Sequence, residues 1–428
     1  MTADTPQRRL RILWLSHLIP YPPKGGAIMR AYHLLRQTAR HHDVDLFTFN
    51  QHRLLANYYP TEEAGLAAAK EALSPLVGRL HIEPIPMSTR RHGQLRMALR
   101  SLFSKTPYTI NWLQSPSAFR RLEQWIKDGK YDLVHFDTES LAPYRSLTSG
   151  LPTLMDHHNA EAHMLLRRAS QERNLLKKLY YWQEGTRLER YERRHLQRYN
   201  HHIVCSEEDR LRLLEIDSEL AVTVIPNGID IASTRPERNA SPEPRLLFIG
   251  GLDWYPNHDA VRWMLLEIWP LLKEKKPELS IDIIGKNPPA ELLEYGSQDP
   301  SIRFHGFVDD IEPYYRDAAM YLCPIRDGGG TKLKILDALA HRLPLVAHSI
   351  ACEGIEVRSG THLLAASNAR DIAKAVCRLL DDPAYAQSLG DAGRDLVANK
   401  YDFSQIGKEL ADLYLGLVLE EPGLSQLY

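Results

Sequence analysis

The sequence predicts an α/β protein of two successive Rossmann-like, doubly wound domains that face a central cleft. Three observations lead to this fold class. The chain has 428 residues, which is long for a single domain. Short apolar runs alternate with helical patterns through the first half, and the alternation starts again after residue 244. Such alternation is typical of a parallel sheet covered by helices on both faces.

In the first half we expect strands at residues 11–16, 44–49, 80–85, 133–136, 153–155, 203–204 and 222–225. Residues 27–40 have a helical pattern in which Ile28, Ala31, Leu34 and Leu35 share one face. A Pro-Asn-Gly turn occupies residues 226–228, and residues 231–244 are rich in Pro, Ser, Asn and charge. We therefore predict an N-terminal domain over residues 1–230 and a linker over residues 231–244.

In the second half we expect strands at residues 246–249, 280–284, 302–304, 320–323 and 345–347. Helical patterns fall at residues 258–275, 288–294, 311–316 and 332–341, then through residues 369–400 and 403–417. These elements predict a C-terminal domain over residues 245–400 and a last helix within residues 401–428. Doubly wound sheets bind ligands outside the carboxyl ends of their strands, so two facing domains would enclose a substrate cleft.

Composition narrows the classes of function. The chain has 53 Lys and Arg against 54 Asp and Glu, and this net charge of -1 gives no support to nucleic-acid binding. The four cysteines lack metal-binding spacing, and their scarcity predicts a reducing, cytoplasmic location. Residues 8–15 resemble the start of a signal peptide, but Pro20, Pro22 and Pro23 follow at once, so we interpret residues 11–16 as the first strand.

The segment from Asp327 to Lys334 carries the strongest chemical signal. A predicted strand ends at Cys323, three glycines follow, and a helix begins near Thr331. Glycines let backbone N–H groups approach an anion, and a helix N-terminus adds partial positive charge. The segment therefore predicts a diphosphate seat; the alternative is an ordinary strand–helix turn with solvated lysines. The residues assigned to the diphosphate are Gly328, Gly329, Gly330, Thr331, Lys332 and Lys334.

Three further positions extend this hypothesis. Asp337, on the same predicted helix, is placed to accept hydrogen bonds from ribose hydroxyls. Gly25 and Gly26 follow the first strand and precede a helix, so their backbone could also meet phosphate oxygens.

The chain has no GxGxxG fingerprint, which removes support for dinucleotide oxidoreduction.

His158 lies at the carboxyl end of a predicted strand, next to His157 and Asp156. We interpret it as polar lining of the cleft, able to bond a sugar hydroxyl or help place an acceptor. A metal site and a purely structural role are the alternatives, and no metal is assigned because adjacent extended residues point in opposite directions. Asp43 and Asp45 match a DxD pattern but start an apolar strand, so we interpret them as charges flanking the core.

Basic residues gather in two stretches, from Arg90 to Lys105 and from Arg167 to Arg198. Either stretch could rest on an anionic membrane surface where a lipid-linked acceptor is held. Glutamates partly neutralise the second stretch, and a solvated helix with internal salt bridges is the alternative interpretation. We expect a cytoplasmic protein with peripheral contact at the inner face of the membrane as one option.

Taken in order, the motifs resemble family 4 of the retaining glycosyltransferases, which have the GT-B fold. The resemblance covers nearly the whole chain and is closest to the branch of bacterial exopolysaccharide and surface-glycan synthesis. It is carried by Pro-Pro-Lys-Gly-Gly at residues 22–26, His-Asn-Ala-Glu at 158–161, Val-Cys-Ser-Glu-Glu at 204–208, Val-Ile-Pro-Asn-Gly-Ile-Asp at 224–230, Phe-His-Gly-Phe-Val at 304–308 and Lys-Ile-Leu-Asp-Ala-Leu-Ala at 334–340.

The resemblance implies a nucleoside-diphosphate sugar donor, with no cofactor and no metal, and a glycan or lipid-linked acceptor. It implies base stacking near Phe307, ribose contact at Asp337 and a sugar site lined by His158. It also implies that the last helix returns to the first domain. Two departures stand out: Gly329 replaces the first of two acids spaced eight residues apart, and Arg and Lys are absent after the first strand of the second domain. Asp327 is the candidate replacement acid, and Lys332 and Lys334 the replacement cations.

We therefore expect transfer of a hexose-type sugar with retention, and assign His158 and Asp327 as the catalytic candidates. Two other classes stay open. A nucleotide-sugar epimerase on the same fold would act without an acceptor. A non-catalytic nucleotide-sugar-binding protein would account for the missing first acid.

Overall fold

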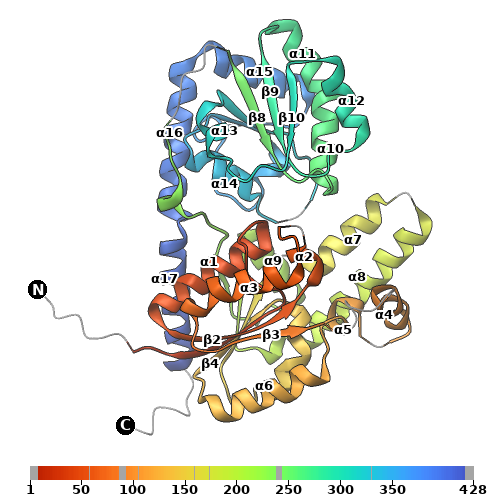
Figure 1. Cartoon of the computed structure of the whole chain (residues 1–428), viewed down its shortest axis with the longest axis vertical. Helices are drawn as coiled ribbons and strands as arrows, with labels where there is room; N and C mark the ends of the chain where they lie inside the picture. The colour runs from red at the N-terminus through yellow and green to blue at the C-terminus, as the bar shows by residue number, and fades with distance from the viewer. Residues whose placement is uncertain are drawn as a thin grey trace, which may run out of the picture. The chain divides into compact units, whose positions relative to one another are not determined.

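The computed structural model describes residues 8–56, 58–85, 93–104, 106–158, 160–172, 174–237, 243–328 and 330–419. It divides into two units: unit 1 is Met1–Pro226 with Ser404–Tyr428, and unit 2 is Asn227–Phe403. In its described part, each unit contains a parallel sheet with helices on both faces (Figure 1). The prediction of two doubly wound α/β domains is confirmed.

The sheet of unit 1 has the strand order β3-β2-β1-β4-β5-β6-β7, with all pairs parallel. Its central strands are almost wholly buried, as expected for strands that helices cover on both faces. The strands are β1 Arg11–Ser16, β2 Asp43–Asn50, β3 Leu80–Pro84, β4 Leu133–Asp137, β5 Thr153–His157, β6 His201–Val204 and β7 Val222–Val224.

Several helices of unit 1 begin at a capping residue. Thr61, Ser115 and Ser206 each accept a hydrogen bond from the backbone N–H three residues later, which satisfies a donor that the helix itself leaves open. The helices are α1 Gly26–His41, α2 His52–Leu55, α3 Glu62–Leu73, α4 Gly93–Leu102, α5 Tyr108–Asn111, α6 Pro116–Gly129, α7 Glu161–Gln171, α8 Leu175–His195, α9 Glu207–Ile216 and α17 Phe403–Leu419.

The sheet of unit 2 has the order β10-β9-β8-β11-β12-β13, again parallel throughout. The strands are β8 Arg245–Ile249, β9 Ser280–Ile284, β10 Ile302–Gly306, β11 Met320–Cys323, β12 Leu345–His348 and β13 Leu364–Ala366. The helices are α10 Tyr255–Trp263, α11 Trp269–Lys275, α12 Ala290–Gln298, α13 Glu312–Asp317, α14 Leu333–Ala340, α15 Ala369–Asp381 and α16 Pro383–Lys400. None of the helices described in either unit is long and apolar enough to cross a bilayer.

In each sheet the strand order reverses at one place. In unit 1 the reversal lies between β1 and β4, and in unit 2 it lies between β8 and β11. The loops that leave the carboxyl ends of two such strands run to opposite faces of the sheet, so ligands of doubly wound folds bind between them. The fold therefore directs attention to the loops after β1 and β4 and after β8 and β11.

The last helix, α17, packs on unit 1. Tyr414 of this helix shares a 2.8 Å hydrogen bond with Nδ1 of His135 in β4, and the carbonyl of Ala411 lies 3.2 Å from Nε2 of His42. The helix approaches α1 so closely that a Cβ on Gly407 would lie 2.2 Å from the Cβ of Gln37. A glycine is therefore required where the two helices meet.

We predict that Gly407→Ala lowers the free energy of unfolding by about 1–3 kcal/mol, because the added methyl group overpacks the contact with α1. The matched control is Gly416→Ala in the same helix, where no atom lies within 4 Å of the added Cβ. That change should be neutral or stabilising by up to about 1 kcal/mol. Urea unfolding of both variants checks the prediction, and equal effects would contradict this packing.

Candidate functional site

In unit 2, the segment from Asp327 to Lys334 follows β11 and forms a loop that is held by its own side chains. Gly328 and Gly330 have positive φ angles of 96° and 68°, a conformation that glycine adopts without strain. The ammonium group of Lys332 donates to the carbonyls of Gly328 and Gly330 at 2.8 and 2.9 Å, and the backbone N–H of Gly328 donates to Asp327 Oδ1 at 2.7 Å. Asp327 and Lys332 therefore shape the loop. Gly329 lies outside the described residues.

Thr331 adds a polar group to this loop. Its hydroxyl is buried, and it has no hydrogen-bond partner among the residues that the structure describes. A buried hydroxyl without a partner costs free energy that a bound acceptor would return. The group can donate to an oxygen placed beside the loop.

The side chain of Lys334 extends from α14, which follows β11, to the loop after β8. Its ammonium group donates to Asn257 Oδ1 at 2.7 Å and lies 4.9 Å from the centre of the Phe248 ring. A Cβ on Gly250 would come within 2.6 Å of this nitrogen, so the lysine occupies the space directly after β8. Burial, together with the nearby charge of Lys332, lowers the pKa of Lys334 to about 8. An ammonium group from α14 thus lies in the space directly after β8.

The loop after β8 completes this edge of unit 2. Asn257 donates to the carbonyl of Gly251 at 2.8 Å, and Pro256 lies against Gly328, so the two loops on either side of the reversal touch. Trp254 and Tyr255 in the same segment are exposed. No sequence signal singled out Asn257, because its role depends on a lysine 77 positions away.

Asp337 lies one turn beyond Lys334 on α14 and is half-buried. Burial raises its pKa to about 6; His341 opposes the rise and Glu312 adds to it. No hydrogen bond or ion pair to this carboxylate is found among the described residues, whereas Glu312 is paired with His341 at 3.0 Å. Asp337 is therefore an acceptor available to a ligand. It is ionised above about pH 6.

Phe307 does not share this loop cluster. It is half exposed and follows β10, which is an edge strand of the sheet. Strands β9 and β8 lie between β10 and β11. The structure thus brings Thr331, Lys332 and Lys334 to the strand reversal and leaves Phe307 at the sheet edge.

In unit 1, His158 lies at the carboxyl end of β5 and is paired with Asp137 from the end of β4. Asp137 also accepts from Ser16 at 2.8 Å and contacts Nδ1 of His17 at 3.1 Å. Burial alone would lower the pKa of His158, but the charge of Asp137 and its hydrogen bond raise it. Burial alone would raise the pKa of Asp137, but His158 and His17 hold it well below its usual value. Each partner therefore favours the charged form of the other, an imidazolium beside a carboxylate.

A second buried ion pair lies beside the first. Arg30 of α1 donates to both carboxylate oxygens of Asp156 at 2.9–3.2 Å and to the carbonyl of Ile225 at 2.8 Å. Burial opposes the charge of Arg30, and Asp156 raises its pKa enough to keep it. Because the guanidinium also binds the chain after β7, it joins three elements of unit 1.

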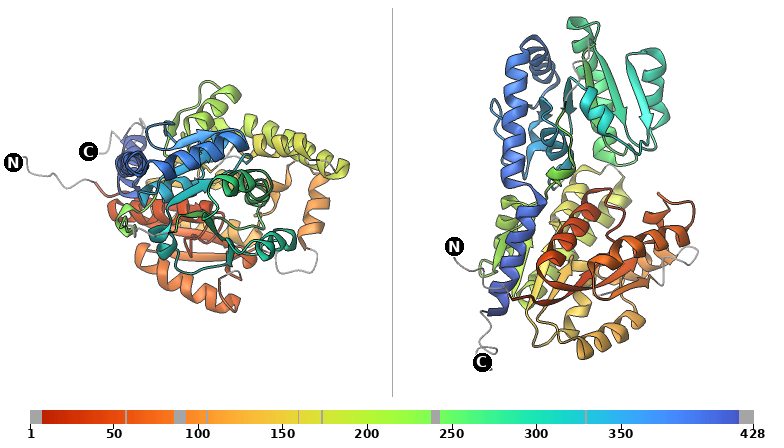
Figure 2. Two further views of the ribbon diagram at one scale, coloured as in Figure 1. Left: turned by 90° about the horizontal axis from the view of Figure 1, so that it is seen from above. Right: turned by 60° about the vertical axis from the view of Figure 1, so that its left-hand side comes forward.

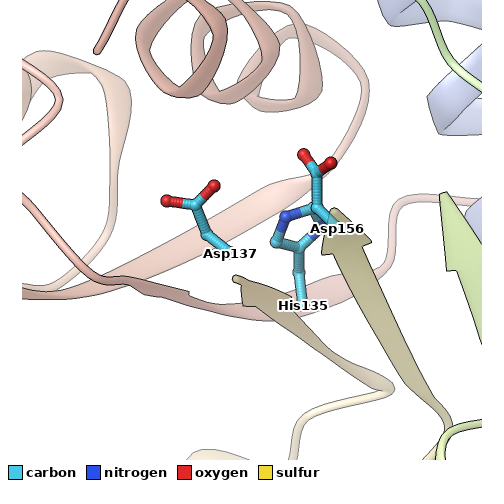
Figure 3. A group of neighbouring side chains, drawn as sticks. All are labelled: His135, Asp137 and Asp156. Carbon is cyan, nitrogen blue, oxygen red and sulfur yellow. The ribbon is translucent and has the colours of Figure 1, made fainter. Parts of the chain in front are cut away.

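The described residues contain one cluster with the composition of a metal site. Ligand atoms of His135, Asp137 and Asp156 lie within 4.8 Å of one another at the ends of β4 and β5 (Figure 3). Both carboxylates are already paired with the cations described above, and burial lowers the pKa of His135 to about 4. With two carboxylates balanced by Arg30 and His158, this group does not fit a further divalent cation.

Gly25 and Gly26 lie at the start of α1 on the other side of the reversal in unit 1. Gly25 has a φ of 101°, and no atom lies within 4 Å of the place where its Cβ would be. Both residues are exposed, and the first N–H groups of a helix have no partner within it. These backbone donors are accessible to an anion.

Two protein families match the chain, one in each half. Residues 24–233 match the family described as Glycosyltransferase Family 4, and residues 243–382 match the family described as Glycosyl transferases group 1. A curated relative from Klebsiella pneumoniae, described as an uncharacterized 44.6 kDa protein in the cps region, is 23% identical over 419 residues. That match covers 93% of this chain and 99% of the relative.

Solved structures with the same fold include sucrose-phosphate synthase from Thermosynechococcus elongatus, with a TM-score of 0.67 and 16% identity. The match covers 96% of this chain and all of that one. Anabaena HepE, solved with UDP and glucose, has a TM-score of 0.64 and 14% identity, with 95% of this chain and all of HepE covered. HepE has also been solved with UDP-glucose.

We predict that His158 titrates above the normal histidine range and that His135 stays neutral at every pH above about 5. The raised pKa stabilises the fold below pH 6.5, and this stabilisation is lost as the pH rises through the folded-state value. Asp137→Asn should lower the pKa of His158. It should also lower the free energy of unfolding by about 3 kcal/mol, because a buried charge loses its partner. NMR titration of the histidine ring protons checks this; a His158 resonance that titrates alike in both proteins would contradict it.

Proposed function

We propose that this chain moves a sugar from a nucleoside-diphosphate sugar to a glycan or lipid-linked acceptor, with retention of the anomeric configuration. The premise is that the chain belongs to the family 4 glycosyltransferases and has the GT-B fold. The observation that carries the donor assignment is the cluster at the strand reversal of unit 2. There the ammonium group of Lys334, the backbone of Gly328 and Gly330, and the Thr331 hydroxyl gather within one pair of loops, and that hydroxyl has no partner among the described residues. Support for the donor class comes from HepE, which binds UDP and UDP-glucose.

The chemistry that we propose for this cluster is stabilisation of the departing diphosphate. When the bond between the anomeric carbon and the diphosphate oxygen breaks, negative charge grows on the leaving group. A lysine held in place beforehand, with backbone N–H groups at the start of α14, stabilises that charge without reorganisation. Lys334 supplies the charge, and Lys332 acts by holding the loop, because its own ammonium is engaged by two loop carbonyls. This account needs no metal ion.

For the nucleoside we propose that Asp337 accepts hydrogen bonds from the ribose and that the exposed ring of Phe307 stacks on the base. The Asp337 carboxylate is ionised at neutral pH and has no partner in the described residues, which suits an acceptor. Asp327 accepts a hydrogen bond within its own loop, and we assign it to positioning that loop beside the donor.

For unit 1 we propose that His158 and the backbone of Gly25 and Gly26 contact the donor sugar and its phosphates. Asp137 raises the pKa of His158, and the Nδ1 of this ring has no partner among the described residues, so in its protonated form His158 has a donor for a ligand oxygen. No residue is assigned as a nucleophile. The acceptor hydroxyl forms the new glycosidic bond as the bond to the diphosphate breaks, and its proton passes to an oxygen of the departing diphosphate.

The proposed reaction is tested by incubating the protein with a panel of nucleotide sugars and oligosaccharide or lipid-linked acceptors. Formation of a glycosylated product whose anomeric configuration matches the donor, read by NMR, is the expected result. The Klebsiella relative in the cps region makes surface-glycan fragments the first acceptors to try. Inversion of the anomeric centre, or epimerisation of the donor with no acceptor present, would overturn the proposal.

We expect Lys334→Ala to weaken the binding of a nucleoside diphosphate by about 10- to 100-fold, the usual value of a charge-assisted hydrogen bond. Binding of the free nucleoside should change little, because the lysine meets the phosphates. The control is Lys286→Ala, which removes the same charge from the end of the neighbouring strand β9. Calorimetry measures the affinities of the wild type and both variants for the nucleoside and for the nucleoside diphosphate. Equal losses for nucleoside and diphosphate, or an equal loss for the control, would place the diphosphate elsewhere.

The lowered pKa of Lys334 predicts a pH dependence. The lysine is charged at pH 7 and loses its proton as the pH rises through about 8, so diphosphate affinity should fall about tenfold between pH 7 and pH 9. Lys334→Arg keeps its charge over this range and should bind with nearly constant affinity. An identical pH profile for both proteins would show that another group controls binding.

A further inference from the structure

Helices α7 and α8 form an antiparallel hairpin that extends beyond the sheet of unit 1 (Figures 1 and 2). One face of α8 packs within the unit. Gly185 contacts Leu165 and Leu166 of α7, and the guanidinium of Arg168 lies 4.5 Å from the centre of the Tyr181 ring. The buried residues of α8 are Glu184, Gly185, Leu188 and Glu192.

The opposite face of α8 is apolar and exposed. At about 100° per residue, Leu175, Leu179 and Trp182 fall within a stripe about 60° wide, and this stripe points away from the packed face. Leu175 is 79% exposed, Leu179 58% and Trp182 54%, and the adjacent Leu176 is 80% exposed. More than half of the surface of each of these four large apolar side chains, on two turns of one helix, is thus left in water.

The hairpin that carries this stripe is basic. Residues 163–183 contain five Lys or Arg and one Glu. Lys177 and Lys178 are exposed, and neither ammonium group has an ion pair or hydrogen bond to another described residue. An exposed apolar stripe in a basic hairpin, with Lys178 beside it and a tryptophan at its end, is the pattern of a helix that lies in the interface of a bilayer.

We propose that the apolar stripe of α8 (Leu175, Leu179 and Trp182), together with the adjacent Leu176, docks on an anionic lipid surface, and that the lysines at the start of α8 strengthen the attraction to the headgroups. Two symmetric copies of this face would bring their cations together, so charge complementarity favours anionic lipid over a second copy of the chain. The second basic stretch predicted from sequence, from Arg167 to Arg198, contains this stripe. The first stretch also exposes Leu99 and Phe103, but residues 90–92 and Lys105 lie outside the described residues. The proposal does not depend on the transferase assignment.

The test is co-sedimentation of the full chain with vesicles of phosphatidylglycerol and phosphatidylcholine, and with vesicles of phosphatidylcholine alone. The wild type should bind the anionic vesicles at least tenfold more tightly than the neutral ones, and salt should weaken this binding. Failure to bind anionic vesicles, with the circular dichroism spectrum of a folded protein, would overturn the proposal.

Two double variants locate the surface. Leu179→Ser with Trp182→Ser, and Lys177→Glu with Lys178→Glu, should each reduce anionic vesicle binding by at least about tenfold. Their matched controls are Leu211→Ser, at a leucine of α9 that is 51% exposed, and Lys70→Glu with Lys408→Glu, at exposed lysines of α3 and α17. The controls should bind as the wild type does. Equal losses in test and control variants would assign the binding to overall charge or hydrophobicity.

Sedimentation velocity without lipid tests the alternative that a second copy of the chain covers the stripe. A monomer in solution is the expected result. A dimer that the Leu179→Ser, Trp182→Ser variant abolishes, with no vesicle binding by the wild type, would show that the stripe is a protein interface.

Discussion

The reversal of strand order in each sheet is the constraint on which the candidate sites depend. Parallel strands require crossover helices, and where the order reverses, the chains leaving two adjacent strands separate to opposite faces. In unit 1 the reversal separates β1 from β4, and Asp137, His158 and the start of α1 gather around it. In unit 2 it separates β8 from β11, where Lys334 meets Asn257. Every group that we assign to diphosphate or sugar chemistry therefore lies on a loop or helix end beside a reversal.

The two reversals are stabilised in different ways. In unit 1, buried carboxylates are matched by buried cations, and Arg30 ties the pair to α1, β5 and the chain after β7. Such pairs add little net stability, but loss of one partner is costly, so they enforce one arrangement of the sheet end. In unit 2, no described carboxylate lies within hydrogen-bonding distance of Lys334, and burial lowers the pKa of this lysine. We propose that this site is preorganised for the negative charge of a bound ligand.

Both proposals rest on features that do not serve stability. A buried lysine without a counter-ion and a stripe of exposed leucines and tryptophan each carry a free-energy cost in the isolated protein. A bound diphosphate would offset the first and a lipid surface the second. The packed face of α8 and the hydrogen bonds that Lys332 makes within its own loop hold the surrounding structure in place around these groups.

The sequence by itself determined the α/β class, the two parallel sheets, the glycine loop after β11 and the membership in the glycosyltransferase family, because each depends on local patterns along the chain. Apolar runs of strand length, glycine clusters and short ordered motifs are visible without knowledge of distant partners. Only the tertiary structure paired His158 with Asp137, gave Lys332 and Lys334 different tasks, and showed which face of α8 is left exposed. These features join residues up to 77 positions apart or depend on which side of a helix is covered. Packing and burial decide such contacts. A periodic sequence pattern shows which face of a helix is apolar, but it does not show which other element, if any, packs against that face.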